Sequence, residues 1–127
     1  MKHLLSKGRY YIGDPARIIK KNKEGDQLIN QLWDVFYQDF NQFQQIKVDG
    51  LIFYMFRTEG GDGIFDGVTT DTGVLMIMNL DQIKDHVAFK QDLTIDGFKV
   101  IDIYSDTWAI VESFNLEIKG YLKIETH

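Results

Sequence analysis

The clearest hydrophobic pattern in the chain is helical and follows the polar stretch Lys20–Gly25. From Asp26 onwards, apolar side chains recur at steps of three and four residues, the period of an amphipathic helix; they are Leu28, Ile29, Leu32, Trp33, Phe36, Phe40 and Phe43. The opposite face is made of Gln, Asn and Asp and carries no positive charge. We predict one long α-helix over about 26–43, with Asp26 as its N-cap and Trp33 buried on its inner face.

After residue 43 the pattern changes to that of β-strands. Leu51–Phe56 and Val74–Met78 are continuously apolar, as expected for strands that are buried on both faces. Asp49-Gly50 and Asp96-Gly97 each stand between apolar residues, the second pair directly after Ile95. Asp-Gly favours a tight hairpin turn because that turn needs positive φ at two successive residues. We therefore predict a hairpin at each pair.

Three other segments have the character of strands. The first is His3–Ile12, which ends at Gly13-Asp14-Pro15 because proline removes a donor and restricts the residue before it. The second is Trp108–Val111. In the last strand of the chain, apolar residues alternate with polar ones and predict one solvated face; the apolar residues are Leu116, Ile118, Leu122 and Ile124. Between these strands, Leu80–His86 predicts one short helical turn capped by Asp81.

These elements predict a single α+β domain over residues 1–127. Its expected architecture is one twisted, mostly antiparallel sheet of about six strands, with the long helix packed on one face. The chain has no cysteine, which excludes disulfide scaffolds, thiolate metal sites and cysteine nucleophiles. It contains no apolar run long enough for a membrane span or a signal peptide, so we expect a cytoplasmic protein without a membrane partner.

The net charge of −5 is unevenly distributed. Residues 1–23 hold seven basic residues against one acid, and residues 24–83 hold two basic residues against ten acids. Such a separation can steer a charged partner, or the basic segment can lie across the acidic body of its own fold. The overall acidity argues against nucleic acid as a partner.

The segment Glu59–Gly73 combines five glycines with four acidic residues. With Asp14, which follows the first strand, these acids are our candidate binding residues: Asp14, Glu59, Asp62, Asp66 and Asp71. An EF-hand starting at Asp62 fails, because Ile64 and Gly73 stand where carboxylate ligands are needed. A divalent-cation site of another kind and an ordinary set of turns both remain open, since Asp and Gly are also standard turn residues.

Three short motifs carry a resemblance to a known family. They are Gly8–Pro15 (GRYYIGDP), Gly61–Phe65 (GDGIF) and Asp71–Ile77 (DTGVLMI). In this order they resemble a family of small uncharacterised bacterial and phage proteins with a "YIGDPCY"-like strand end, a "GDG" turn and a "VDxG" strand start. The chain departs from the family at Ala16-Arg17, where the family has Cys-Tyr. The resemblance implies a compact β-rich fold in which Asp14 lies near the acids of residues 62–71.

The sequence offers no recognisable catalytic arrangement. The histidines and serines stand outside any nucleophile or metal-ligand motif, so we assign no catalytic residue and no cofactor other than the cation considered above. The function that we expect is that of a non-catalytic cytoplasmic binding or accessory protein, which contacts a protein partner through its acidic surface. The alternative is a metal-dependent enzyme or cation-binding protein that uses loop 59–73.

Overall fold

The computed structural model describes residues 1–93 and 96–127. Within these residues the fold is α+β, as predicted, with one α-helix, α1 (Lys23–Phe36), and eleven strands. The strand pairs are antiparallel. The prediction of one six-stranded sheet was wrong, because the described strands form three sheets.

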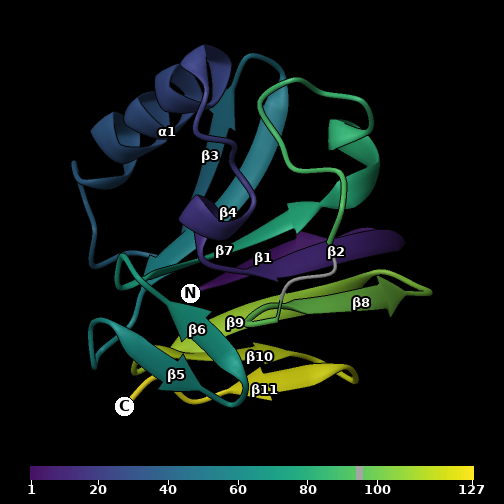
Figure 1. The fold of residues 1–127 in the computed structure, drawn as a ribbon. Helices are drawn as coiled ribbons and strands as arrows, with labels where there is room; N and C mark the ends of the chain where they lie inside the picture. Colours follow the sequence, from purple (N-terminus) through teal and green to yellow (C-terminus); the bar gives the residue numbers. More distant parts are fainter. Residues whose placement is uncertain (94–95) are drawn as a thin grey trace.

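The molecule is layered, with a five-stranded sheet in the middle (Figure 1). This sheet has the order β3-β4-β7-β2-β8, and its strands are β2 (Gly8–Gly13), β3 (Gln44–Val48), β4 (Leu51–Arg57), β7 (Val74–Asn79) and β8 (Lys99–Ile103). Helix α1 covers one face. The other face packs against a four-stranded sheet of β1 (Lys2–Leu5), β9 (Thr107–Glu112), β10 (Asn115–Ile118) and β11 (Leu122–Ile124). The third sheet is the short hairpin of β5 (Gly63–Phe65) and β6 (Val68–Thr70).

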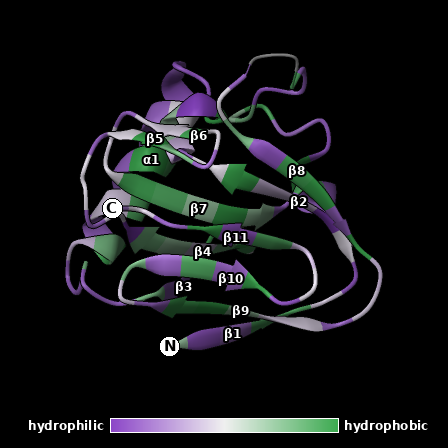
Figure 2. Cartoon of the chain, turned by 90° about the horizontal axis from the view of Figure 1, so that it is seen from below, coloured by the Kyte–Doolittle hydropathy of each residue, from purple (hydrophilic) through white to green (hydrophobic). Residues whose placement is uncertain are grey.

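Strand β7 shows why the fold needs a second sheet. Its side chains alternate between two cores, so that Met76 packs in the core under α1, whereas Leu75 and Ile77 pack in the core against the second sheet. Figure 2 shows β7 as a largely hydrophobic strand in the interior of the molecule. The prediction that Val74–Met78 is buried on both faces is therefore confirmed. Burial of the second face requires the second sheet, since apolar surface stabilises the fold only when it is removed from water.

The predicted first strand is divided between two sheets. β1 pairs with β9 in the outer sheet, and β2 pairs with β7 and β8 in the central sheet. The exposed residues Ser6 and Lys7 make the crossing between them. At the start of β2, Gly8 lies so close to Asn79 that an added Cβ would come within 2.8 Å of the Asn79 amide nitrogen. The segment His3–Ile12 thus contributes strands to two sheets, although its sequence has the character of a single strand.

Helix α1 is shifted and shorter than the predicted span of 26–43. Its N-cap is Asn22 instead of Asp26, and the Asn22 side chain accepts a hydrogen bond from the backbone N–H of Gly25 at 2.7 Å. The helix ends at Phe36, where the side-chain amide of Gln44 donates to the main-chain oxygen of Phe36 at 2.8 Å. Beyond this end the chain forms turns, and Phe43 packs in the core between the two sheets.

The predicted buried face of the helix is confirmed for three residues and wrong for two others. Leu28, Leu32 and Phe36 are buried in the core under α1. Trp33, which we predicted to be buried, is half-buried at the margin of that core. Phe40 lies outside the helix and is 43% exposed. The helical period therefore continues in the sequence beyond the point where the chain leaves the helix.

The two Asp-Gly pairs have different surroundings. Asp49 and Gly50 connect β3 to β4 with φ values of 51° and 79°, which confirms the predicted hairpin turn. For the second hairpin, the preceding residue Ile95 lies outside the described residues. The main-chain oxygen of Gly97 accepts a hydrogen bond from Thr69 of β6 at 2.9 Å, and the chain then continues into β8.

The other short elements are found close to their predicted places. The last predicted strand is a hairpin of β10 and β11, in which Leu116, Ile118 and Ile124 are buried as the alternation predicted. The predicted short helical turn is the 3-10 helix η2 (Leu80–Ile83), but its N-cap is Asn79 instead of Asp81. Strand β9 contains the predicted segment Trp108–Val111.

In the described residues, the helix is too short and too polar to cross a membrane.

Candidate functional site

The acidic loop Glu59–Gly73 contains the hairpin of β5 and β6. Asp66 and Gly67 form its turn with φ values of 50° and 82°, so this part of the Gly/Asp pattern serves turn geometry. The Asp66 carboxylate also accepts a hydrogen bond from the backbone N–H of Glu125 at 2.8 Å. Asp66 therefore connects the hairpin to the residue that follows β11.

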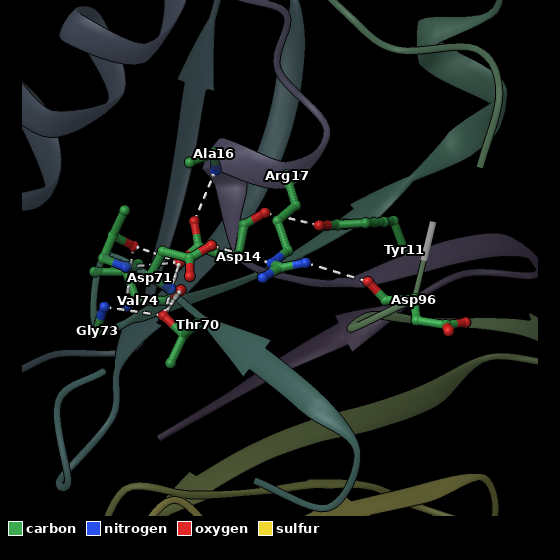
Figure 3. Close-up of polar contacts among 10 residues, drawn as sticks. Tyr11, Asp14, Ala16, Arg17, Thr70, Asp71, Gly73, Val74 and Asp96 are labelled. Carbon is green, nitrogen blue, oxygen red and sulfur yellow. Dashed lines mark hydrogen bonds and ion pairs between the residues drawn. The ribbon is translucent and has the colours of Figure 1, made fainter. Parts of the chain in front are cut away.

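Asp14 is completely buried. Its side chain contacts residues of the acidic loop (Figure 3). One carboxylate oxygen accepts from the backbone N–H of Ala16 at 2.8 Å, at the start of the 3-10 helix η1 (Pro15–Arg17). The other accepts from two hydroxyls and two backbone N–H groups of the acidic loop; these donors are Thr70 Oγ1 (2.7 Å), Asp71 N (2.8 Å), Thr72 N (2.9 Å) and Thr72 Oγ1 (2.8 Å). The carboxylate joins the end of β2 to the turn between β6 and β7.

The main chain of Asp14 makes a further buried contact. Its carbonyl oxygen accepts a hydrogen bond from the Tyr11 hydroxyl at 2.7 Å. Burial of the phenol raises the pKa of Tyr11 above its ordinary value, and the charge of Asp14 raises it further. Tyr11 is therefore held in its neutral form as a hydrogen-bond donor at this junction.

Asp71 contacts Asp14 through its backbone N–H, and its own side chain is exposed at the surface. Its carboxylate forms an ion pair with Arg17, with 3.1 Å between Oδ2 and Nε. Arg17 also donates to the main-chain oxygen of Asp96 at 3.2 Å (Figure 3). This ion pair connects the basic N-terminal segment to the acidic loop, one of the two arrangements that the charge distribution left open.

Glu59 and Asp62 lie at the start of the loop. Glu59 faces His127, with 3.3 Å between Oε2 and Nδ1, and its backbone N–H donates to Thr126 Oγ1 at 3.1 Å. Asp62 is exposed. The candidate acids thus have different surroundings. Asp14 is buried, Asp66 bonds to the backbone of Glu125, and Asp71 pairs with Arg17. Glu59 and Asp62 lie at the rim of a groove. Across the residues that the structure describes, no three His, Asp or Glu side chains are grouped so that they could hold a metal ion.

This groove, which we call the aromatic–acidic groove, lies between the C-terminal end of α1 and the acidic loop. Its volume is about 220 Å³, and its lining residues that matter here are Tyr37, Phe40, Arg57, Glu59 and Asp62. Tyr37 is 54% exposed and Phe40 43% exposed, although both are large aromatic residues. Aromatic residues are enriched at protein interfaces, and here two exposed rings border the same hollow as two carboxylates. The groove is therefore the candidate functional site.

Sequence reasoning found two of these residues and missed the others. Glu59 and Asp62 were candidates because of the acidic loop, but Tyr37 and Phe40 were counted as parts of a longer helix. The polar sequence Gln38-Asp39 between the two rings, followed by Asn41-Gln42, was the signal for an earlier helix end, because Asn and Asp favour turns. Once the helix ends at Phe36, both rings belong to the turns after it and reach the surface.

Arg57 is the basic residue in the wall of this groove, and its position is fixed. Its guanidinium carbon lies 4.3 Å from the centre of the Phe114 ring and 5.5 Å from that of the Phe40 ring. Its Nε donates to Asn41 Oδ1 at 2.8 Å. Aromatic rings of this region thus already hold one guanidinium by cation–π contact.

Comparisons of the chain with family models, with curated proteins and with solved structures found no match. The choice of the aromatic–acidic groove therefore depends on its own geometry. Two features support it: aromatic surface that is left uncovered, and carboxylates that border the same hollow.

Proposed function

We propose that this protein is a non-catalytic binding or accessory protein, which contacts a protein partner through its acidic surface. The contact would be centred on the aromatic–acidic groove. The observation that carries the proposal is that two exposed aromatic rings and two carboxylates line the same groove. The rings are those of Tyr37 and Phe40, and the carboxylates are those of Glu59 and Asp62.

The chemistry of this surface favours a protein over other ligands. Aromatic residues are enriched in the centres of protein interfaces, because they offer a large apolar area at a small cost in side-chain entropy. The bordering carboxylates favour a partner with a basic surface and would raise its rate of association. A partner segment with an apolar residue and a neighbouring positive charge would complement both parts of the groove.

The groove is also placed on a rigid support. Helix α1 is fixed to the central sheet by Leu28, Leu32 and Phe36, which lie in the same core as the strands. The acidic loop is fixed through Asp14 and through the bonds of Glu59 and Gly60 to Thr126. Surfaces that are held in place before binding lose less entropy on association.

The proposal is tested by affinity capture from cells that contain the partner. The bait variant Tyr37→Ser with Asp62→Lys alters the groove. The control variant Tyr104→Ser with Asp106→Lys makes the same changes at the β8–β9 turn, where Tyr104 is 74% exposed at the opposite end of the sheets (Figure 1).

We expect a protein that is retained by the wild type and by the control but lost by the groove variant. Its retention should fall as salt concentration rises, because salt screens exposed charges. Equal retention by all three baits would refute the groove as the binding surface. Circular dichroism of each bait checks that the substitutions leave the fold intact.

A further inference from the structure

The partner group that enters the aromatic–acidic groove can be specified further. We infer that it is an arginine side chain, whose guanidinium stacks on Tyr37 and faces the carboxylate of Asp62. This inference rests on the proposed function, since it names the group that the same groove would recognise.

The first support is a row of aromatic rings that leads from α1 into the groove. The ring centres of Trp33 and Tyr37 are 5.6 Å apart, and those of Tyr37 and Phe40 are 6.4 Å apart. The faces of aromatic rings carry negative electrostatic potential and attract cations placed over them. With its large exposed fraction, Tyr37 is the ring of this row most open to an incoming cation.

The second support is the C-terminal end of α1, which, within the described residues of the helix, has no basic side chain in its last turn. Asp34 adds a negative charge there. A helix C-terminus carries the negative end of the helix dipole and favours a cation nearby. Glu59 and Asp62 add two carboxylates to the groove, against the one positive charge of Arg57, so negative charge is in excess around Tyr37.

The third support is Arg57, which shows how this region holds a guanidinium. Its planar group lies over Phe114 and Phe40, while its edge donates to the side-chain oxygen of Asn41 and to the main-chain oxygen of Thr58. Contact of this kind, with the face on a ring and the edge on oxygen, suits arginine and not lysine, because an ammonium group is compact and strongly hydrated. Tyr37 and Asp62 offer a second ring and a second oxygen group in the same groove.

The size of the groove agrees with a single side chain. Its volume of about 220 Å³ is smaller than the ~300–1,000 Å³ of pockets that enclose whole small-molecule ligands. The aliphatic stem of an arginine would lie along Phe40 while its charged end reaches Asp62, since long basic side chains bury their stems on apolar surface.

The inference is tested with three acetylated and amidated pentapeptides, Gly-Gly-X-Gly-Gly, in which X is arginine, lysine or citrulline. Citrulline has nearly the shape of arginine but no charge. Binding to the full-length protein is followed by proton–nitrogen correlation NMR at the backbone amides of Tyr37, Asp62 and Gly73. We expect the arginine peptide to bind more tightly than the citrulline peptide by about threefold or more. The lysine peptide should fall between them.

Two variants separate stacking from charge. Tyr37→Leu keeps an apolar residue but removes the ring, and it should reduce the preference for arginine over lysine. Asp62→Asn should weaken both charged peptides. The control Tyr104→Leu should leave all affinities unchanged.

The possible failures are distinguishable. Equal binding of arginine and lysine peptides, or an arginine preference that survives Tyr37→Leu, would overturn the arginine inference, while loss of partner capture by the groove variant would still support the proposed function. Shifts confined to amides outside the groove, or no shifts with any peptide, would also overturn the inference. Only unchanged capture by the groove variant would overturn the proposed function itself.

Discussion

Removal of the Asp14 carboxylate should have a large effect on stability, although Asp14 lies outside both cores. In an Asp14→Ala variant, the donors of Ala16, Asp71 and Thr72 lose their acceptor. Three of these donors are backbone N–H groups, which cannot turn away as the threonine hydroxyls can. A fully buried donor without a partner costs ~1–3 kcal/mol, which sets an upper range of ~3–9 kcal/mol for three; the three bonds here are part-buried. Water that enters the vacated space would bring the loss towards the lower limit, so we expect about 3–5 kcal/mol.

The Asp14→Asn variant refines this prediction. Its side-chain oxygen can still accept from the loop donors, but its amide group would then face the N–H of Ala16, where two donors meet. We expect a loss of about 1.5–3 kcal/mol, between the alanine variant and the wild type. As a matched control, Asp62→Ala removes an exposed carboxylate and should change stability by less than ~0.5 kcal/mol.

The measurement is urea unfolding followed by tryptophan fluorescence. A lower midpoint with an unchanged slope would show a loss of folding stability and not a change in the unfolded state. A loss below ~1 kcal/mol for Asp14→Ala would refute this reasoning, because the three backbone donors would then be satisfied without the carboxylate. In that case Asp14 would again be a candidate for ligand binding.

Three further predictions concern other positions. The double variant Asp62→Asn with Asp66→Asn should leave thermal stability unchanged or higher, because Asn accepts positive φ and the same hydrogen bond at residue 66; a clear fall in the melting temperature would contradict this. For Tyr11, the folded-state pKa is raised above the unfolded value of 10.0, so its contribution to stability is complete below pH 10.0 and is lost as pH rises beyond it. Alkaline unfolding curves should show that loss, and Tyr11→Phe should remove part of the pH dependence, so identical curves would count against it. Gly25→Ala should cost roughly 2 kcal/mol or more, because the added Cβ would clash with the main-chain oxygen of Lys20; thermal unfolding indistinguishable from the wild type would show that the backbone relaxes freely there.

The helix and the buried strands could be predicted from the sequence because each follows from local periodicity. Leu28, Leu32 and Phe36 recur at helical spacing, and Val74–Met78 is too uniformly apolar for a strand with a solvated face. The end of the helix could not be placed in this way, since Phe40 and Phe43 continue the same spacing. At its true end, the side-chain amide of Gln44, eight residues from Phe36, donates to the carbonyl group of Phe36 and to that of Asp39 in the turn that follows.

The second sheet and the Asp14 junction depend on contacts between distant parts of the chain. No local pattern reveals that β1 pairs with β9, or that His3–Ile12 is shared between layers. Likewise, all the donors to Asp14 except the backbone N–H of Ala16 come from residues 56 to 58 positions away, so spacing alone could not identify them. The motif resemblance implied that Asp14 lies near the acids of residues 62–71, and Asp71 does meet it, although through its backbone N–H.

The pairing of the N-terminal strand has a consequence for how the chain acquires its structure during synthesis. The amino group of Met1 bonds to the main-chain oxygen of Val111, a separation of 110 positions, and β1 follows the same register along β9. Strand β1 therefore has no pairing partner until the chain has been made as far as β9. Because contacts between distant positions form slowly, β1 should gain amide protection late in pulse-labelled refolding, after the hairpin of β3 and β4. During that interval, apolar residues such as Leu4 and Leu5 are free to contact other newly made chains, so association through β1 should increase with protein concentration.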